Sequence, residues 1–131
     1  MEGIATTQQS HRLMFTIAAI FNWLVGLGLL LDARTALGLI GVDPLPTEFT
    51  FLRIVGGLVF LFGFWYYRAG TDLRSVASAI WLGAIAKVMV FSLAVFDTLT
   101  GGISWHFPML ASADVVFAIL FFRALRELDR Q

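Results

Sequence analysis

The chain has 131 residues, of which 59% are hydrophobic and 14% are charged. Soluble globular domains average about 45–50% apolar and about 25% charged residues. A domain this small has too little interior to bury the additional apolar residues. Nine basic and nine acidic residues leave no net charge, which excludes a nucleic-acid-binding protein. The absence of cysteine excludes disulfides and thiolate chemistry. The composition therefore predicts a small integral membrane protein.

Four stretches are long and apolar enough to cross a bilayer, which takes about 17–25 residues of helix. They cover residues 13–31, 46–67, 75–96 and 103–122. Open sheets leave backbone groups unpaired in hydrocarbon, so all four are predicted to be helices. The expected fold is an all-α, antiparallel, up-down four-helix bundle that forms one membrane domain over residues 1–131. Pro46 can begin the second helix, because its missing N–H costs nothing in a first helical turn.

The connection between the first two spans is the longest and is unusually apolar. Asp32 closes the first span, and residues 33–40 can form a short helix that ends at Gly41. This segment is unusually hydrophobic for a loop, because it contains Leu37, Leu39 and Ile40. We therefore expect a short interfacial helix between helices 1 and 2.

The distribution of arginine predicts the orientation in the membrane. Four spans place both termini and the connection between spans two and three on one side. That side holds Arg12, Arg68, Arg74, Arg123, Arg126 and Arg130, whereas the other holds Arg34 and Arg53. Both termini are therefore predicted to be cytoplasmic. The aromatic cluster of residues 65–67 is then expected at the cytoplasmic interface, with Trp105 and His106 at the outer one.

Three polar residues lie near the middle of apolar spans: Asn22 in the first, Lys87 in the third and Asp114 in the fourth. A central Lys or Asp costs about 2.5–3.5 kcal/mol to insert, so both are expected to turn inward and to meet. Small residues allow close helix approach in membranes. Those at helical spacing from the three polar residues are Ala18, Ala19, Gly26, Ala79, Gly83, Ala84, Ala94, Ala111 and Ala118.

The cluster of Asn22, Lys87 and Asp114 has more than one interpretation. Lys87 and Asp114 can form a structural lock that fixes helix register. Alternatively they form the floor of a site for a proton, an ion or a small ligand, together with Asn22. A contact with a partner subunit is a third interpretation.

Arg53 and His106 are candidates for an outer vestibule. Arg53 can anchor at the interface, pair with Glu48 or Asp32, or bind an anion. Asp97 and His106 flank the loop between spans three and four, but one histidine and one aspartate are too few to predict a metal site. The 13 phenylalanines fit lipid contact and bundle packing, and they fit equally a cavity for a flat apolar ligand such as a sterol or a quinone.

Several short motifs resemble the DoxX-like superfamily of small four-helix bacterial membrane proteins. They run from Leu52 to Tyr66, with Gly56-Gly57-Leu58-Val59 and Gly63, and continue through Asp72-Leu73-Arg74 and Gly83 to Lys87. They end with Trp105-His106-Phe107 and Asp114. The resemblance covers about the last two-thirds of the chain. It implies the bacterial inner membrane and an accessory or ligand-binding subunit of quinone-linked complexes.

The sequence therefore predicts an accessory membrane subunit that binds a small hydrophobic, quinone-related ligand at a buried polar site. The alternative is a small proton-coupled transporter that acts through the Lys87–Asp114 pair, as a homo-oligomer. An intramembrane enzyme is the weakest interpretation, because the sequence has no nucleophile constellation, no histidine cluster and no pair of catalytic carboxylates. The sequence identifies no cofactor, and it is compatible with membership of a larger membrane complex.

Overall fold

The computed structural model describes residues 2–43 and 45–130, with side chains from Ser10 onward. Its long helices are α1 (Glu2–Leu39), α2 (Thr50–Ala69), α3 (Ala77–Leu99) and α4 (His106–Asp129), and a 3-10 turn, η1 (Arg74–Val76), precedes α3. Within the described ranges there is no strand. All four helices are long and apolar enough to cross a membrane. The predicted all-helical class and the four apolar spans are confirmed, and they mark the chain as a multi-pass membrane protein.

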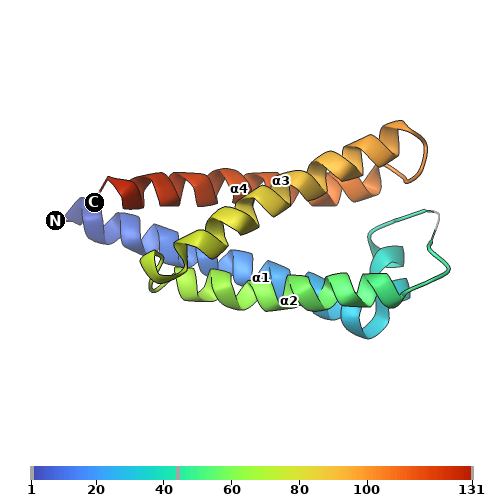
Figure 1. Ribbon diagram of the computed structural model, residues 1–131, viewed down its shortest axis with the longest axis horizontal. Helices are drawn as coiled ribbons and strands as arrows, with labels where there is room; N and C mark the ends of the chain where they lie inside the picture. Colours follow the sequence, from blue (N-terminus) through green and yellow to red (C-terminus); the bar gives the residue numbers. More distant parts are fainter. Residues whose placement is uncertain (1, 44, 131) are drawn as a thin grey trace.

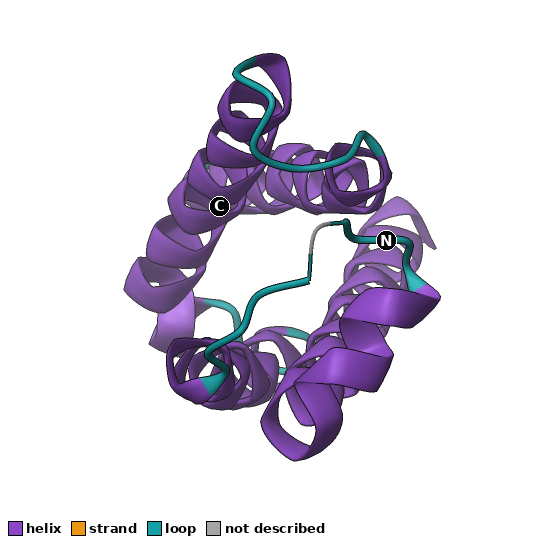
Figure 2. Ribbon diagram, turned by 90° about the vertical axis from the view of Figure 1, so that its right-hand side faces the viewer, coloured by secondary structure: helices purple, strands orange, loops and turns teal. Residues whose placement is uncertain are grey.

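The four helices form two hairpins. Helix α1 packs along α2, and α3 packs along α4. The chain termini and the α2–α3 connection lie at one end of the molecule, here called the terminal end (Figure 1). The other two connections lie at the opposite end, here called the loop end. The hairpins converge at the terminal end and diverge toward the loop end, and from the loop end the helices are arranged in a ring (Figure 2).

The α1–α2 hairpin depends on glycines that bring the two backbones into contact. A Cβ built on Gly26 would lie 2.6 Å from the Phe60 nitrogen and 2.7 Å from the Gly56 carbonyl oxygen. A Cβ on Gly56 would lie 2.8 Å from the Leu30 nitrogen. No side chain fits at either position without moving a helix. Close backbone approach through small residues is a main source of helix association in membranes.

Helix α1 changes direction at Asp32. The backbone of Asp32 is extended (φ −154°, ψ 75°) within an otherwise helical run. Its carboxylate accepts hydrogen bonds from the Thr35 N–H at 3.2 Å and from the Thr35 hydroxyl at 2.7 Å. Asp32 therefore ends the first straight segment and caps the helical residues that follow. These residues end at Gly41, whose positive φ of 77° suits glycine.

Helix α2 begins at Thr50 and not at Pro46, so that predicted boundary is wrong. Proline tolerates a first helical turn, but it cannot satisfy the free N–H groups there. The carboxylate of Glu48 accepts a hydrogen bond from the Thr50 N–H at 2.7 Å. Hydrogen bonds from Thr50 also lower the pKa of the Glu48 carboxyl below its usual value. Glu48 therefore satisfies one of the free first-turn N–H groups where α2 begins.

Candidate functional site

The three polar residues singled out in the sequence form one hydrogen-bonded chain. The Lys87 Nζ donates to Asp114 Oδ1 at 2.7 Å and to Asn22 Oδ1 at 3.1 Å. The Asn22 Nδ2 donates to the Val59 carbonyl oxygen at 3.0 Å. These residues belong to α3, α4, α1 and α2 in turn. The predicted meeting of Asn22, Lys87 and Asp114 (the polar triad) is therefore confirmed, and through Val59 it connects all four helices.

The members of the polar triad differ in accessibility. Asn22 and Lys87 are only 4% and 6% exposed. The Asp114 side chain is 17% exposed, although it lies near the middle of α4. Asp114 is therefore the most accessible member of the polar triad.

Aromatic rings surround the ammonium of Lys87. The Nζ lies 5.4 Å from the ring centroid of Tyr66, 5.5 Å from that of Phe117 and 5.7 Å from that of Phe21. Ring faces attract a cation electrostatically at this range. An ammonium has three N–H donors, and among the described residues two of them have hydrogen-bond partners. One donor thus remains for a further acceptor.

Tyr66, which was expected with Trp65 and Tyr67 at the cytoplasmic interface, is buried within the bundle. Tyr66 is 2% exposed, whereas its neighbours Trp65 and Tyr67 are 47% and 53% exposed. The hydroxyl of Tyr66 lies against α3, where a Cβ on Gly83 would approach it to 2.6 Å. The sequence did contain a signal for this burial. Tyr66 follows Gly63 by three residues, which places it on the same face of α2 as that buried glycine.

The main buried apolar cluster lies on one side of the polar triad, and a smaller set of buried apolar residues lies on the loop side: Ala33, Leu37, Val42, Ala94 and Ala111. The members of the main cluster in α1 precede Asn22, and those in α2 follow Val59. Its members in η1 and α3 precede Lys87, and those in α4 follow Asp114. The cluster consists of Phe15, Ala18, Ala19, Tyr66, Ala69, Val76, Ile80, Ala84, Ala118, Phe121, Ala124 and Leu125. All of them lie on the terminal side of the triad, toward the end where the hairpins converge (Figure 1).

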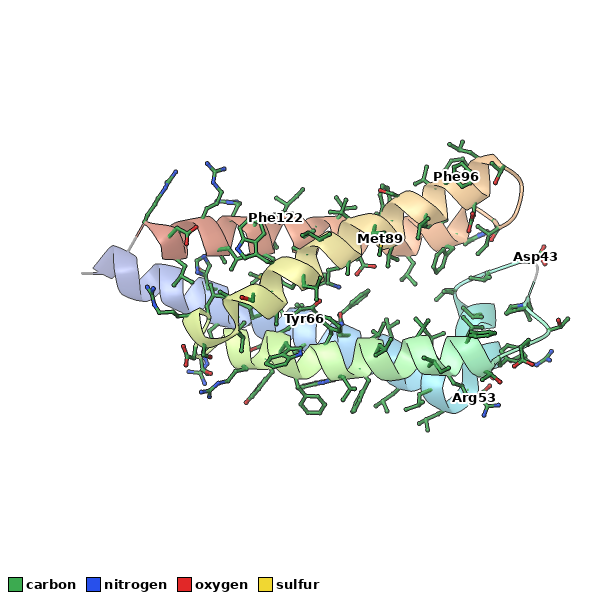
Figure 3. All side chains as sticks on the ribbon, viewed as in Figure 1. Asp43, Arg53, Tyr66, Met89, Phe96 and Phe122 are labelled. Carbon is green, nitrogen blue, oxygen red and sulfur yellow. The ribbon has the colours of Figure 1, made fainter. Side chains whose placement is uncertain are left out.

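Arg53 and His106 have different surroundings at the loop end. Arg53 lies on α2 and points away from the α3–α4 hairpin (Figure 3). His106 is the first residue of α4, and its ring lies against Gly41, where a Cβ would be 2.9 Å from the His106 Cγ. The outer vestibule that these two residues suggested stays a prediction. No group of three or more His, Cys, Asp or Glu within reach of one metal ion occurs in the described part of the chain.

Comparisons with protein-family models, with curated proteins and with solved structures find no match for this chain.

Proposed function

We propose that this protein binds a flat, uncharged, lipid-soluble molecule with a hydrogen-bond acceptor, of the quinone class, at the Lys87 ammonium. The observation that carries the proposal is the buried ammonium with an unused donor among three aromatic rings. A quinone carbonyl would accept from that donor, and its ring would lie against the aromatic side chains.

The charge of the site favours a neutral ligand. Lys87 and Asp114 form a close ion pair at 2.7 Å, so the site has no net charge when both are ionised. An anion would have to compete with Asp114 for the ammonium, whereas a carbonyl oxygen needs only the remaining donor. The apolar tail of such a ligand would extend toward the loop end, where the hairpins diverge (Figure 1).

The setting we propose is an antiparallel bundle in the bacterial inner membrane, with both termini cytoplasmic and residues 33–40 in the outer interface. The chain would act there as an accessory subunit of a larger membrane complex. The arginine distribution supports the orientation. The resemblance to the DoxX-like superfamily supports the role.

The proton-coupled transporter remains a second candidate, because Asp114 is both paired with Lys87 and partly exposed. An accessible carboxylate in a buried ion pair can exchange a proton with a transported solute. Proton flux in liposomes that Asp114→Asn abolishes would favour this alternative. Quinone binding without proton flux would favour the first proposal.

The test is a binding titration in phosphatidylcholine nanodiscs with a short-chain quinone, followed by quenching of tryptophan fluorescence. We expect saturable binding by the native chain and at least tenfold weaker binding by Lys87→Met/Asp114→Leu. A hydrogen bond from a charged donor contributes about 1.5–3 kcal/mol, which is about 10-fold to 100-fold in affinity. The double variant is used because it leaves no unpaired charge.

The matched control is Arg53→Met, which removes an exposed cation that points away from the triad (Figure 3). This control is expected to bind as the native chain does. Equal affinity in the native chain and the double variant, or no saturable quenching by the native chain, would overturn the proposal.

A further inference from the structure

The two connections at the loop end are hydrogen-bonded to each other. The Ser104 N–H donates to the Asp43 carbonyl oxygen at 3.1 Å, and the Ser104 hydroxyl donates to the Gly41 carbonyl oxygen at 2.9 Å. The ring of His106 packs against Gly41. We call these four residues, Gly41, Asp43, Ser104 and His106, the clasp. The clasp joins the α1–α2 hairpin to the α3–α4 hairpin at the end where they diverge.

The clasp is weaker than the other connection between the hairpins. At the terminal end, the hairpins share the apolar core and the contact of His11 Nε2 with Glu127 Oε2 at 3.0 Å. At the loop end, the clasp residues Asp43 and His106 are exposed and Gly41 and Ser104 are half-buried. Hydrogen bonds with access to water exchange readily with it, so the clasp can open while the core stays folded.

Contacts within each hairpin are more extensive than contacts between the two hairpins. Within the α1–α2 hairpin, the backbones touch at Gly26 and Gly56, which holds these helices together along their length. Between the polar triad and the clasp, by contrast, the main apolar cluster contributes no residue, and the apolar residues buried there are few: Ala33, Leu37, Val42, Ala94 and Ala111. Opening of the clasp would therefore part the hairpins at the loop end and uncover Asp114 and Lys87 to the surrounding lipid.

We infer that the clasp is a latch that controls lateral access of a lipid-soluble ligand to the polar triad. When the clasp is closed, the hairpins are held at both ends and exchange of the ligand is slow. When it is open, the ligand passes between the hairpins from the loop-end half of the bilayer. This inference rests on the proposed quinone-class ligand for its role, but the movement itself is testable without any ligand.

The first experiment locks the clasp. The chain has no cysteine, so Asp43→Cys/Ser104→Cys introduces a single thiol pair. The backbone hydrogen bond between these residues, at 3.1 Å, makes them neighbours across the two connections. In nanodiscs we expect a short-chain quinone to associate at least tenfold more slowly with the oxidised form than with the reduced form. Reductant should restore the faster rate. Ser104→Cys alone, treated with the same oxidant, is the control and should show no change.

The second experiment measures the hairpin separation without ligand. Spin labels replace Leu31 and Phe96, which are 78% and 62% exposed near the loop end. Gly41→Ala/Ser104→Ala removes the hydroxyl hydrogen bond and strains the positive φ of Gly41. We expect this variant to shift the distance distribution toward longer values and to broaden it.

The two experiments separate the latch from the ligand. Equal association rates in the oxidised and reduced forms would overturn lateral access through the loop end. An unchanged distance distribution in Gly41→Ala/Ser104→Ala would overturn the latch itself. If no form binds a quinone but the distances change, then the proposed ligand is wrong while the movement stands.

Discussion

Replacing Asp114 alone by alanine is expected to destabilise the protein more than replacing both members of the ion pair. Asp114→Ala leaves the Lys87 ammonium buried without its carboxylate partner. Removal of one member of a buried ion pair typically costs about 3–5 kcal/mol. Lys87→Met/Asp114→Leu removes both charges and keeps the interior filled, so its unfolding free energy should lie within about 1 kcal/mol of the native value. Unfolding by SDS in mixed micelles, followed by helical circular dichroism, measures both variants.

The control for this comparison is Asp97→Ala, which removes an exposed carboxylate near the end of α3. A surface change of this kind should alter stability by no more than about 0.5 kcal/mol. If Asp114→Ala and the double variant unfold at the same SDS fraction, then the pairing of Lys87 with Asp114 contributes nothing to the unfolding free energy.

The same double variant distinguishes the two roles of the polar triad. A purely structural lock predicts that quinone titration of a folded double variant gives the native result, because the bundle is intact. A ligand site predicts a folded protein with weaker binding. Hydrogen bonds that connect four helices serve stability and binding together. Measurement of both properties on one variant is therefore needed to separate them.

The sequence alone predicted the polar triad because two properties suffice: the depth of each residue in its span and the free-energy cost of a charge in lipid. A lysine and an aspartate at the centres of neighbouring apolar helices must avoid lipid, and each is the other's best partner. The same reasoning could not identify Tyr66, Phe21 and Phe117 around the ammonium. Which aromatic side chains face inward depends on how far each helix is rotated about its axis. That rotation follows from glycine contacts between backbones, which one sequence does not specify.

The clasp shows a different limit of sequence reasoning. Its acceptors are the backbone carbonyl oxygens of Gly41 and Asp43, and every residue has such a group. Gly41 was expected only to end a short helix. The structure shows that it also receives the ring of His106, which a residue with a Cβ would push away. His106 itself was a candidate, with Arg53, for an outer vestibule, and no signal in the sequence pointed to its contact with Gly41. Nearness in depth does not determine which loops touch.

Two adjacent glycines of α2 provide the sharpest test of the hairpin packing. A Cβ at Gly56 would lie 2.8 Å from the Leu29 Cβ and the Leu30 nitrogen, whereas a Cβ at Gly57 meets nothing within 4 Å. Gly56→Ala must push α1 away from α2, and overpacking of this kind costs about 1–3 kcal/mol. Gly57→Ala adds no clash and removes backbone freedom, so it should be neutral or stabilising by up to about 1 kcal/mol.

The measurement is again SDS unfolding in mixed micelles, with the two alanine variants compared in parallel. Because each variant adds one methyl group to the same helix, a general effect of alanine on helix stability cancels in the comparison. The difference that remains reports the α1–α2 backbone contact. If both variants unfold together, then α1 and α2 do not approach each other at Gly26 and Gly56. The α1–α2 hairpin would then not be rigid, and opening of the clasp would not part the two hairpins as proposed.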